Sequence, residues 1–465
     1  MLPDSFLISK VITLWKNKWQ ISDISTHRGI TLGNIPIKIM EAVIMMRINE
    51  HLEHFGLIDS WQHGFQKKRS TIINLVNTWE FLSSQINANQ SWVSLSVDFS
   101  NAFDRISISH LLLALQKRGI RGQLGKFLEY WMKNRKQIVQ VGEQLSTPGA
   151  CTSGVGQGSI GGPIFFCILL SEVINNLPTD GTEKVCLKIW CFTDDTHFIF
   201  RSRNHQESLI AQEFIDSFIT ASAEVGLQVN AKKSVVVYYG NHNYVTPIII
   251  DGSVVPVENE SLELGCVFTN KMNFKPQLER NVKKANSFIY TIRSVMKVRN
   301  HHVLEKFYYT YYCPILLYAS QVWLTDHVYM QDTLYAMHRK FWRLGNGYIS
   351  PKPYILDTYQ LALKHSLTFL FQMKMGHNCL EFNDFFTEKK GEATRSHSNK
   401  ELVIQRNRTV NRDAFFTTFI AKEFNMLPLT MRQAKSVNIF KNQLRDHLKM
   451  TIPMPNFNYT PWYKR

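Results

Sequence analysis

Hydrophobic and polar residues alternate along the segment 91–99 in the pattern of a β-strand. Val93, Leu95 and Val97 fall on one side, and Ser94, Ser96 and Asp98 fall on the other. A period of two predicts a half-buried strand with Asp98 near its carboxyl end. This strand lies within residues 1–240, where strand-like and helix-like patterns follow one another.

Two further segments have the pattern of hairpins. Residues 186–200, CLKIWCFTDDTHFIF, have β-type residues on both sides of a polar centre. This arrangement predicts a hairpin with the adjacent Asp194 and Asp195 at its tip. Residues 137–145 predict a second hairpin that turns at Gly142 and the residue after it.

Two other segments have apolar residues at helical spacing and are predicted to be helices. Apolar residues recur at helical intervals from 209 to 225, with Gly226 as the C-terminal cap, and a shorter helix is expected from Ser109 to Gly119. Strands and helices in segregated order predict an α+β protein.

Composition narrows the class of protein. The chain has 465 residues, 44% of them hydrophobic, which excludes disorder over most of its length. Its 53 Lys and Arg against 37 Asp and Glu give a net charge of +16, which favours a polyanionic partner, either nucleic acid or an acidic membrane surface. The longest apolar run, residues 163–170, is too short to span a membrane, and the N-terminus lacks the order of a signal peptide. The seven cysteines include no C-x-x-C pair, so we expect reduced thiols rather than disulfides or zinc.

Three carboxylates are the candidate chemistry. Adjacent carboxylates such as Asp194 and Asp195 repel each other on a tight turn, and a divalent cation with oxygen ligands, such as Mg²⁺, removes that repulsion. Asp98, from a neighbouring strand, would complete a two-metal site for phosphoryl transfer. The alternative is an ordinary solvated turn, since Asp favours turns for local reasons.

Eight segments in order resemble one family of proteins. They are STHRGITLGNIPIKIMEAVIMMRI (25–48), QHGFQKKRST (62–71), SVDFSNAFDRI (96–106), SGVGQGSIGGP (153–163), FTDD (192–195), GLQVNAKKSVVV (226–237), LELGCVF (262–268) and PILLYASQVW (314–323). Together they resemble the reverse transcriptases of non-LTR, LINE-type retrotransposons, including the jockey-like elements. A group II intron maturase or telomerase-like polymerase would share the palm motifs but fits QHGFQKKRST and PILLYASQVW less well.

The resemblance implies a right-hand polymerase architecture with an antiparallel palm sheet. Fingers and palm would occupy residues 1–270, a helical thumb 271–345, and a helical extension with a candidate role in nucleic-acid binding 346–465. The implied activity is RNA-directed DNA polymerisation from a primer 3′-hydroxyl. Its partners would be an RNA template, a DNA primer or target and deoxynucleoside triphosphates, with no membrane. We expect an intracellular ribonucleoprotein in the nucleus or cytoplasm, while the oligomeric state is not indicated.

The resemblance also implies metal ligands. Asp98 and Asp194, with the backbone carbonyl of Phe99, would hold two Mg²⁺ ions, for which Mn²⁺ could substitute, and Asp195 would support the site. Lys233 would protonate the leaving pyrophosphate, or else it is a surface lysine.

Nucleotide and nucleic-acid contacts follow from the same resemblance. The incoming nucleotide would meet Arg28, Lys67, Lys68, Arg69, Phe103, Gln157 and Gly158, and a duplex would meet Lys275, Arg280, Lys283, Lys284 and Arg293. Phe103 is either a steric gate beneath the sugar or a core aromatic on a short helical turn. Which of the three basic residues 67–69 contacts the triphosphate stays open. We expect Asp104 to be an ion-pair partner beside Arg105 rather than a ligand, and most tyrosines of 308–312 to pack inside the thumb.

Three positions depart from the family pattern. Thr193 stands where Ala is usual, Gly156 where Pro is usual and Gln66 where Arg is usual. These departures favour the alternative of a catalytically degenerate copy that only binds nucleic acid. No upstream endonuclease segment is recognisable, so we expect a truncated reading frame or part of a larger polyprotein.

Overall fold

The computed structural model describes residues 3–16, 23, 26–178, 182–241, 246–297, 299–345, 355–389 and 401–451. These residues form two compact units. Unit 1 comprises residues 1–67, 93–237 and 242–258, and unit 2 comprises 68–92, 238–241 and 259–465.

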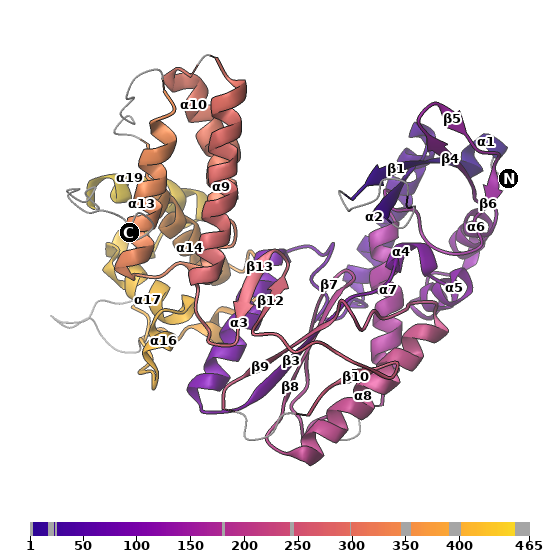
Figure 1. Cartoon of the computed structure of the whole chain (residues 1–465), viewed down its shortest axis with the longest axis horizontal. Coiled ribbons are helices and arrows are strands. Elements are labelled where there is room, and N and C mark those ends of the chain that lie inside the picture. Colours follow the sequence, from indigo (N-terminus) through magenta and orange to yellow (C-terminus); the bar gives the residue numbers. More distant parts are fainter. Residues whose placement is uncertain are drawn as a thin grey trace. The chain divides into compact units, whose positions relative to one another are not determined.

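Unit 1 is built around a four-stranded sheet with the order β7-β8-β3-β9. Its strands are β3 (Trp92–Val97), β7 (Lys188–Phe192), β8 (Asp195–Arg201) and β9 (Val235–Tyr239) (Figure 1). Helix α8 (His205–Glu224) packs on aromatic residues of this sheet, and helix α7 (Gly162–Asn175) packs on Phe99, just after β3. Phe198 of β8, for example, meets Phe218 of α8 at 4.9 Å between ring centroids.

A second sheet of unit 1 has the order β2-β1-β4-β5, with β6 paired to β4. Its strands are β1 (Ile8–Trp15), β2 (His27–Leu32), β4 (Lys136–Val141), β5 (Gln144–Leu145) and β6 (Gly149–Ala150). The remaining elements of unit 1 are α1 (Asp4–Leu7), α2 (Ile35–His54), α4 (Ala102–Arg105), α5 (Ile108–Lys117), α6 (Gly122–Lys133), β10 (Ile249–Ile250) and β11 (Ser253–Val254).

Unit 2 is mainly helical. It contains α3 (Thr71–Asn87), the hairpin β12 (Glu260–Glu263) and β13 (Cys266–Thr269), α9 (Lys275–Val295), α10 (His301–Phe307), a π-helical turn (Tyr308–Tyr312), α11 (Cys313–Leu316), α12 (Ser320–Trp323), α13 (Val328–Trp342), α14 (Thr358–Lys374), α15 (Phe382–Phe385), α16 (Val410–Asp413), α17 (Phe416–Met426), α18 (Leu429–Arg432) and α19 (Val437–Thr451). Asp357 caps α14 with a capping box: its carboxylate accepts from the Gln360 backbone N–H, and Oε1 of Gln360 accepts from the Asp357 N–H.

Most expected elements are present, and the α+β class is confirmed. The hairpin over 137–145 turns at Gly142 as expected, since Val141 pairs with Gln144. The cap of α5 is Ser107 rather than Ser109, because it is the Ser107 hydroxyl that accepts from the first turn. All seven cysteines are free.

The strand expected over 91–99 is present as β3, but the expectation that it is half-buried was wrong, because most of β3 is buried on both sides. Ser94, on the side expected to face solvent, is fully buried, and its hydroxyl lies 2.7 Å from Nε2 of His197 on β8. A hydrogen-bond partner within the sheet offsets the free-energy cost of removing a polar side chain from water. In the part of the chain that the structure describes, no helix is long and apolar enough to cross a bilayer. The domain boundaries at 270 and 345 stay predictions.

Candidate active site

The hairpin of β7 and β8 ends in the tight turn expected from the sequence. Phe192 pairs with Asp195, so Thr193 and Asp194 are the two residues of the turn. Asp195 is the exposed first residue of β8, whereas Thr193 is buried with a φ of +60°. Asp194 therefore stands at the tip as expected, whereas Asp195, expected beside it at the tip, is the first residue of β8 because it pairs with Phe192.

Asp98 directly follows β3 and is held by the segment 226–237. Its backbone N–H donates to the Ser234 hydroxyl at 3.2 Å, and its carbonyl accepts from the Asn230 N–H at 2.7 Å. Asn230 and Ser234 of the segment GLQVNAKKSVVV thus fix the backbone of Asp98. Lys233, within the same segment, has its Nζ 3.4 Å from Oδ2 of Asp98.

The electrostatics of Asp98 and Asp194 suit a cation. Partial burial raises the pKa of Asp194 above its ordinary value, the Asp98 charge raises it further, and the Arg28 guanidinium lowers it. The Oδ2 atom of Asp98 is shielded from solvent and accepts no hydrogen bond. A shielded carboxylate oxygen that lies 3.4 Å from the Lys233 ammonium and close to a second carboxylate is a fitting ligand for a hard cation.

The Lys233 ammonium forms an ion pair with the Asp98 carboxylate. More than half of that side chain is exposed, so the ion pair is a weak one. Among the described residues, no group of three acidic, histidine or cysteine side chains converges to hold a metal. Asp98 is close enough to Asp194 to raise its pKa, but the described residues contain no three-carboxylate cluster.

The loop of residues 153–163 is anchored to β2. The Thr31 N–H donates to the Gln157 carbonyl at 2.6 Å. At Gly158 the φ is +109°, and a Cβ would stand 2.8 Å from the Thr31 carbonyl oxygen. Only glycine tolerates both conditions.

Asp104 differs from the expected ion-pair partner. Its Oδ2 accepts from Nε2 of Gln157 at 3.3 Å, while the Arg105 guanidinium donates to Oε1 of Gln228 at 2.8 Å. Local desolvation raises the pKa of Asp104, and the Lys16 charge opposes this. The expectation failed because the neighbouring Arg105 side chain is used elsewhere.

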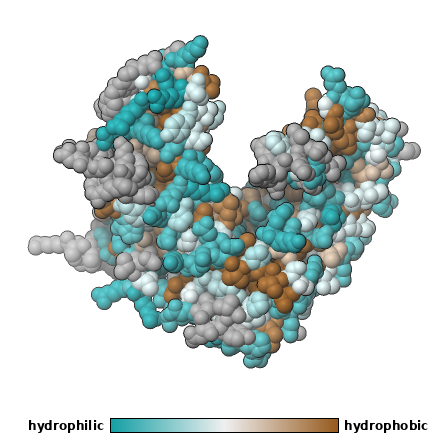
Figure 2. All heavy atoms as spheres, in the orientation of Figure 1, coloured by the Kyte–Doolittle hydropathy of each residue, from teal (hydrophilic) through white to brown (hydrophobic). Residues whose placement is uncertain are grey.

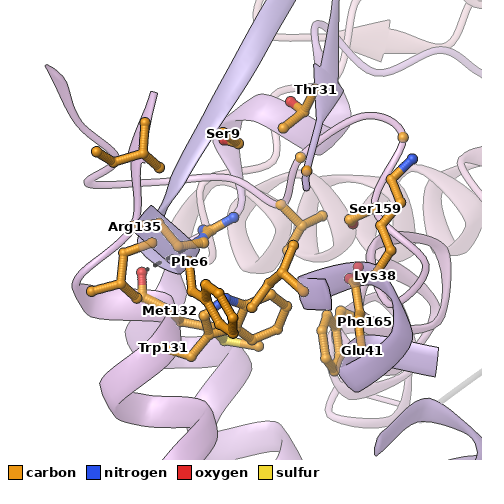
Figure 3. Close-up of a pocket in the computed structure, with 17 residues that line it drawn as sticks. Phe6, Ser9, Thr31, Lys38, Glu41, Trp131, Met132, Arg135, Ser159 and Phe165 are labelled. Carbon is orange, nitrogen blue, oxygen red and sulfur yellow. Dashed lines mark hydrogen bonds between the residues drawn. The ribbon is translucent and has the colours of Figure 1, made fainter. Parts of the chain in front are cut away.

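A small cavity of about 60 Å³ lies beside this loop. Figure 3 shows its lining, which includes Thr31 from β2, Glu41 from α2 and Arg135 close to β4. The buried Glu41 accepts from the Gly161 N–H at 3.0 Å, and Arg135 donates to the Gly154 carbonyl at 2.6 Å. These two charged groups therefore brace both ends of the loop.

The residues expected to contact the nucleotide are not all in one part of the structure. Phe103 lies on the short helix α4, partly exposed, with its ring 5.3 Å from that of Phe166. Lys67 pairs with Glu53 at 2.8 Å in unit 1, whereas the Lys68 ammonium donates to the Gly376 carbonyl at 3.0 Å in unit 2. The roles assigned to Arg28, Lys67, Lys68, Arg69, Phe103, Gln157 and Gly158 stay predictions.

The basic residues expected to meet a duplex lie on one long helix, α9. Lys275, Lys283, Lys284 and Arg293 are exposed, but Arg280 is partly buried. The surface over α9 and α13 is mainly hydrophilic in the view of Figure 2. Tyr308 and Tyr312 are fully buried, but Tyr309 and Tyr311 are about half exposed, so two of these four tyrosines, rather than most of them, pack inside.

The segment 314–323 braces the hairpin β12–β13. The Tyr318 hydroxyl donates to the Leu264 carbonyl at the hairpin turn, at 2.5 Å, and the Trp323 indole donates to the Tyr318 carbonyl at 2.7 Å. Buried Asn281 of α9 donates to the carbonyls of Leu316 and Tyr318, both at 3.1 Å. Sequence motifs identified these segments but not the network that joins them, since its members are far apart in the chain.

Sequence reasoning also missed the role of Gln62. This residue was recognised only as part of QHGFQKKRST, yet its side chain is fully buried against the turn that carries Asp194. No local periodicity signals such a contact, because the partner lies 131 residues away.

Comparison with known proteins gives consistent matches. A family model described as "Reverse transcriptase (RNA-dependent DNA polymerase)" matches residues 16–300. The RNA-directed DNA polymerase from mobile element jockey of Drosophila melanogaster is 22% identical over 326 residues, 69% of this chain and 36% of that protein. The probable RNA-directed DNA polymerase from transposon X-element of the same species is 24% identical over 310 residues, 64% of this chain and 33% of that protein. The chain thus spans about a third of the length of the curated relatives it matches.

Two solved structures are similar over most of this chain. A telomerase from Candida tropicalis, in complex with a fragment of telomeric RNA, has a TM-score of 0.41 at 10% identity and covers 71% of this chain and 64% of its own. The RNA-dependent RNA polymerase of a human picobirnavirus has a TM-score of 0.41 at 10% identity, with 72% of this chain and 58% of its own covered.

Proposed function

The chain belongs to the reverse transcriptase (RNA-dependent DNA polymerase) family, and on that premise we propose that it is the polymerase part of a non-LTR retrotransposon. It would extend the 3′-hydroxyl of a DNA primer on an RNA template, using deoxynucleoside triphosphates. Its compartment would be the nucleus or the cytoplasm, as a ribonucleoprotein.

The observation that carries the proposal is the pairing of Asp98 and Asp194. The Asp98 carboxylate has a shielded oxygen that accepts no hydrogen bond and lies 3.4 Å from the Lys233 ammonium, and burial together with the Asp98 charge raises the pKa of Asp194. Two such groups resist being brought together unless a cation accompanies them. Their positions, after β3 and at the hairpin tip, agree with the motifs on which the family resemblance rests.

Asp98 and Asp194 would hold Mg²⁺, together with the carbonyl of Phe99. Bound Mg²⁺ would lower the pKa of the primer hydroxyl and stabilise the charge on the leaving pyrophosphate. Asp195 would support the site through its charge. Gln157 and Gly158 would lie against the nucleotide on a loop braced by Glu41 and Arg135. Lys233 would donate a proton to pyrophosphate once Asp98 no longer holds its ammonium.

Primer extension on an RNA template tests the proposal. Wild-type protein with Mg²⁺ should incorporate deoxynucleotides, and chelation of the metal should abolish incorporation. Asp98→Asn and Asp194→Asn should each lower the rate by at least about a hundredfold, since one metal ligand contributes several kcal/mol to the transition state.

Asp216→Asn, on the exposed side of α8, is a matched control that should extend normally. RNA binding by the Asp194→Asn variant should equal that of wild type. Wild-type protein that binds RNA but never extends a primer would instead identify a degenerate copy, and near-normal extension by Asp194→Asn would refute the site assignment.

A further inference from the structure

Residues 61–64 pair with the end of β7, the strand that leads into the turn at Thr193 and Asp194. The Cys191 N–H donates to the Trp61 carbonyl at 2.9 Å, and the His63 N–H donates to the Cys191 carbonyl at 2.8 Å. Gln62 and Cys191 thus form a parallel bridge. The segment adds a short strand to the end of β7, just before the turn.

The Gln62 side chain contacts the turn itself, at the backbone of Thr193. Its Oε1 accepts from the Thr193 N–H at 2.9 Å and from the Gly64 N–H at 2.8 Å, and its Nε2 lies 3.4 Å from the Thr193 carbonyl oxygen. The side chain is completely buried. Both backbone groups of Thr193 are therefore in contact with one amide group.

Thr193 needs such support because its backbone is strained. A β-branched residue with positive φ is unusual, and the first position of a two-residue hairpin turn of this kind normally has glycine. Strained residues persist only where the surrounding structure holds them. Gly64 makes room for the contact, since a Cβ there would lie 2.5 Å from Oγ1 of Thr193 and 2.6 Å from its backbone nitrogen.

We propose that Gln62 is a positioning residue of the catalytic hairpin, whose amide clamps the strained Thr193 and so sets the place of Asp194 relative to Asp98. The consequence for catalysis rests on the proposed function. Thr193 and Asp194 share a peptide bond, so release of the Thr193 backbone moves the Asp194 carboxylate. A displacement of about 1 Å is enough to impair a metal site or reacting geometry.

Amide hydrogen exchange in the full chain tests the clamp without reference to activity. Gln62→Met keeps the side-chain volume but removes both hydrogen-bonding atoms. Peptides covering residues 188–198 should then exchange at least about tenfold faster, while other peptides of unit 1 stay unchanged.

The matched control is Gln360→Met in unit 2. Gln360 is also buried, with Oε1 accepting from the Asp357 N–H at 3.0 Å and Nε2 donating to the Leu448 carbonyl at 2.9 Å. This variant loses a similar amide and should leave exchange at residues 188–198 unaltered. Unchanged exchange of the hairpin in Gln62→Met would overturn the proposal.

Extension assays then test the catalytic consequence. Gln62→Met should lower kcat at least about tenfold and raise the Mg²⁺ concentration for half-maximal activity, with little effect on the affinity for primer and template. In a Thr193→Gly background the strain is relieved, so the same substitution should have a smaller effect on exchange and on kcat. If the Gln62→Met protein melts too low to assay, the same measurements are made on the Thr193→Gly protein with and without Gln62→Met.

The outcomes separate the two proposals. If wild type does not extend primers, the proposed function fails, and the exchange experiment still decides whether Gln62 clamps the hairpin. If wild type extends, and Gln62→Met loosens the hairpin while kcat and the Mg²⁺ requirement match those of wild type, the positioning role is wrong.

Discussion

Replacing Phe103 by alanine separates two explanations of this aromatic ring. Phe103 lies five residues after Asp98, on a short helix, with one side of its ring near Phe166 and the rest partly exposed. If the exposed side faces the nucleotide sugar, the ring leaves no room for a 2′-hydroxyl. If it is simply part of the core, the sugar is not affected.

The structure gives an expected size for each effect. A fully buried Phe replaced by Ala loses about 3–5 kcal/mol of stability, and a partly exposed one loses less, here about 2–3 kcal/mol. A clash and an unsatisfied hydroxyl discriminate by about 1–3 kcal/mol, which is roughly ten- to a hundredfold in specificity. Phe103→Ala should therefore accept ribonucleotides ten- to a hundredfold better and melt only moderately lower.

The assay compares incorporation of each ribonucleotide with its deoxynucleotide partner, together with thermal melting. Phe218→Ala is the control, because Phe218 is almost completely buried and packs against Phe99 and Phe198. It should lose more stability than Phe103→Ala and keep the sugar preference. If Phe103→Ala melts as low as Phe218→Ala and its sugar preference is unchanged, Phe103 is a core residue and the gate is refuted.

Three other outcomes are expected. Lys283→Ala with Lys284→Ala should reduce the slope of log affinity for a primer–template duplex against log salt by up to about two, and an unchanged slope would exclude phosphate contacts from these exposed lysines. Lys233→Met should lower kcat by about a hundredfold or more if it protonates pyrophosphate, and by less than about twofold if it is a surface lysine. Burial raises the pKa of Asp357 to about 7, so its contribution to stability is present below about pH 4 and is lost as the pH rises to 7. Asp357→Asn keeps the helix cap and should gain stability over wild type across that range, by at most about 4 kcal/mol, whereas a constant difference in melting temperature would show that Asp357 does not titrate there.

Family membership could be predicted from sequence because the motifs are local. The matched family and the jockey relatives confirm the resemblance that the eight ordered segments indicated. The hairpin with Asp194 at its tip and the turn at Gly142 were also predictable, since alternation and turn residues act over a few positions. The same reasoning placed Asp98 at a strand end.

Contacts between distant segments were not predictable in this way. Alternation suggested that Ser94 faces water, but His197 supplies a partner from another strand and the residue is buried. Sequence proximity suggested a pairing of Asp104 with Arg105, but Gln157 and Gln228 compete for those groups from other segments.

The hydrogen bonds that hold the candidate active site are also contacts between distant segments. Gln62 touches Thr193, Glu41 touches Gly161, and Ser234 touches Asp98, each across many residues of chain. Periodicity and turn chemistry therefore indicate where strands, helices and turns lie. Which side chain satisfies a buried polar group depends on how the chain folds back on itself, because hydrogen bonds are short-ranged in space and indifferent to separation in sequence.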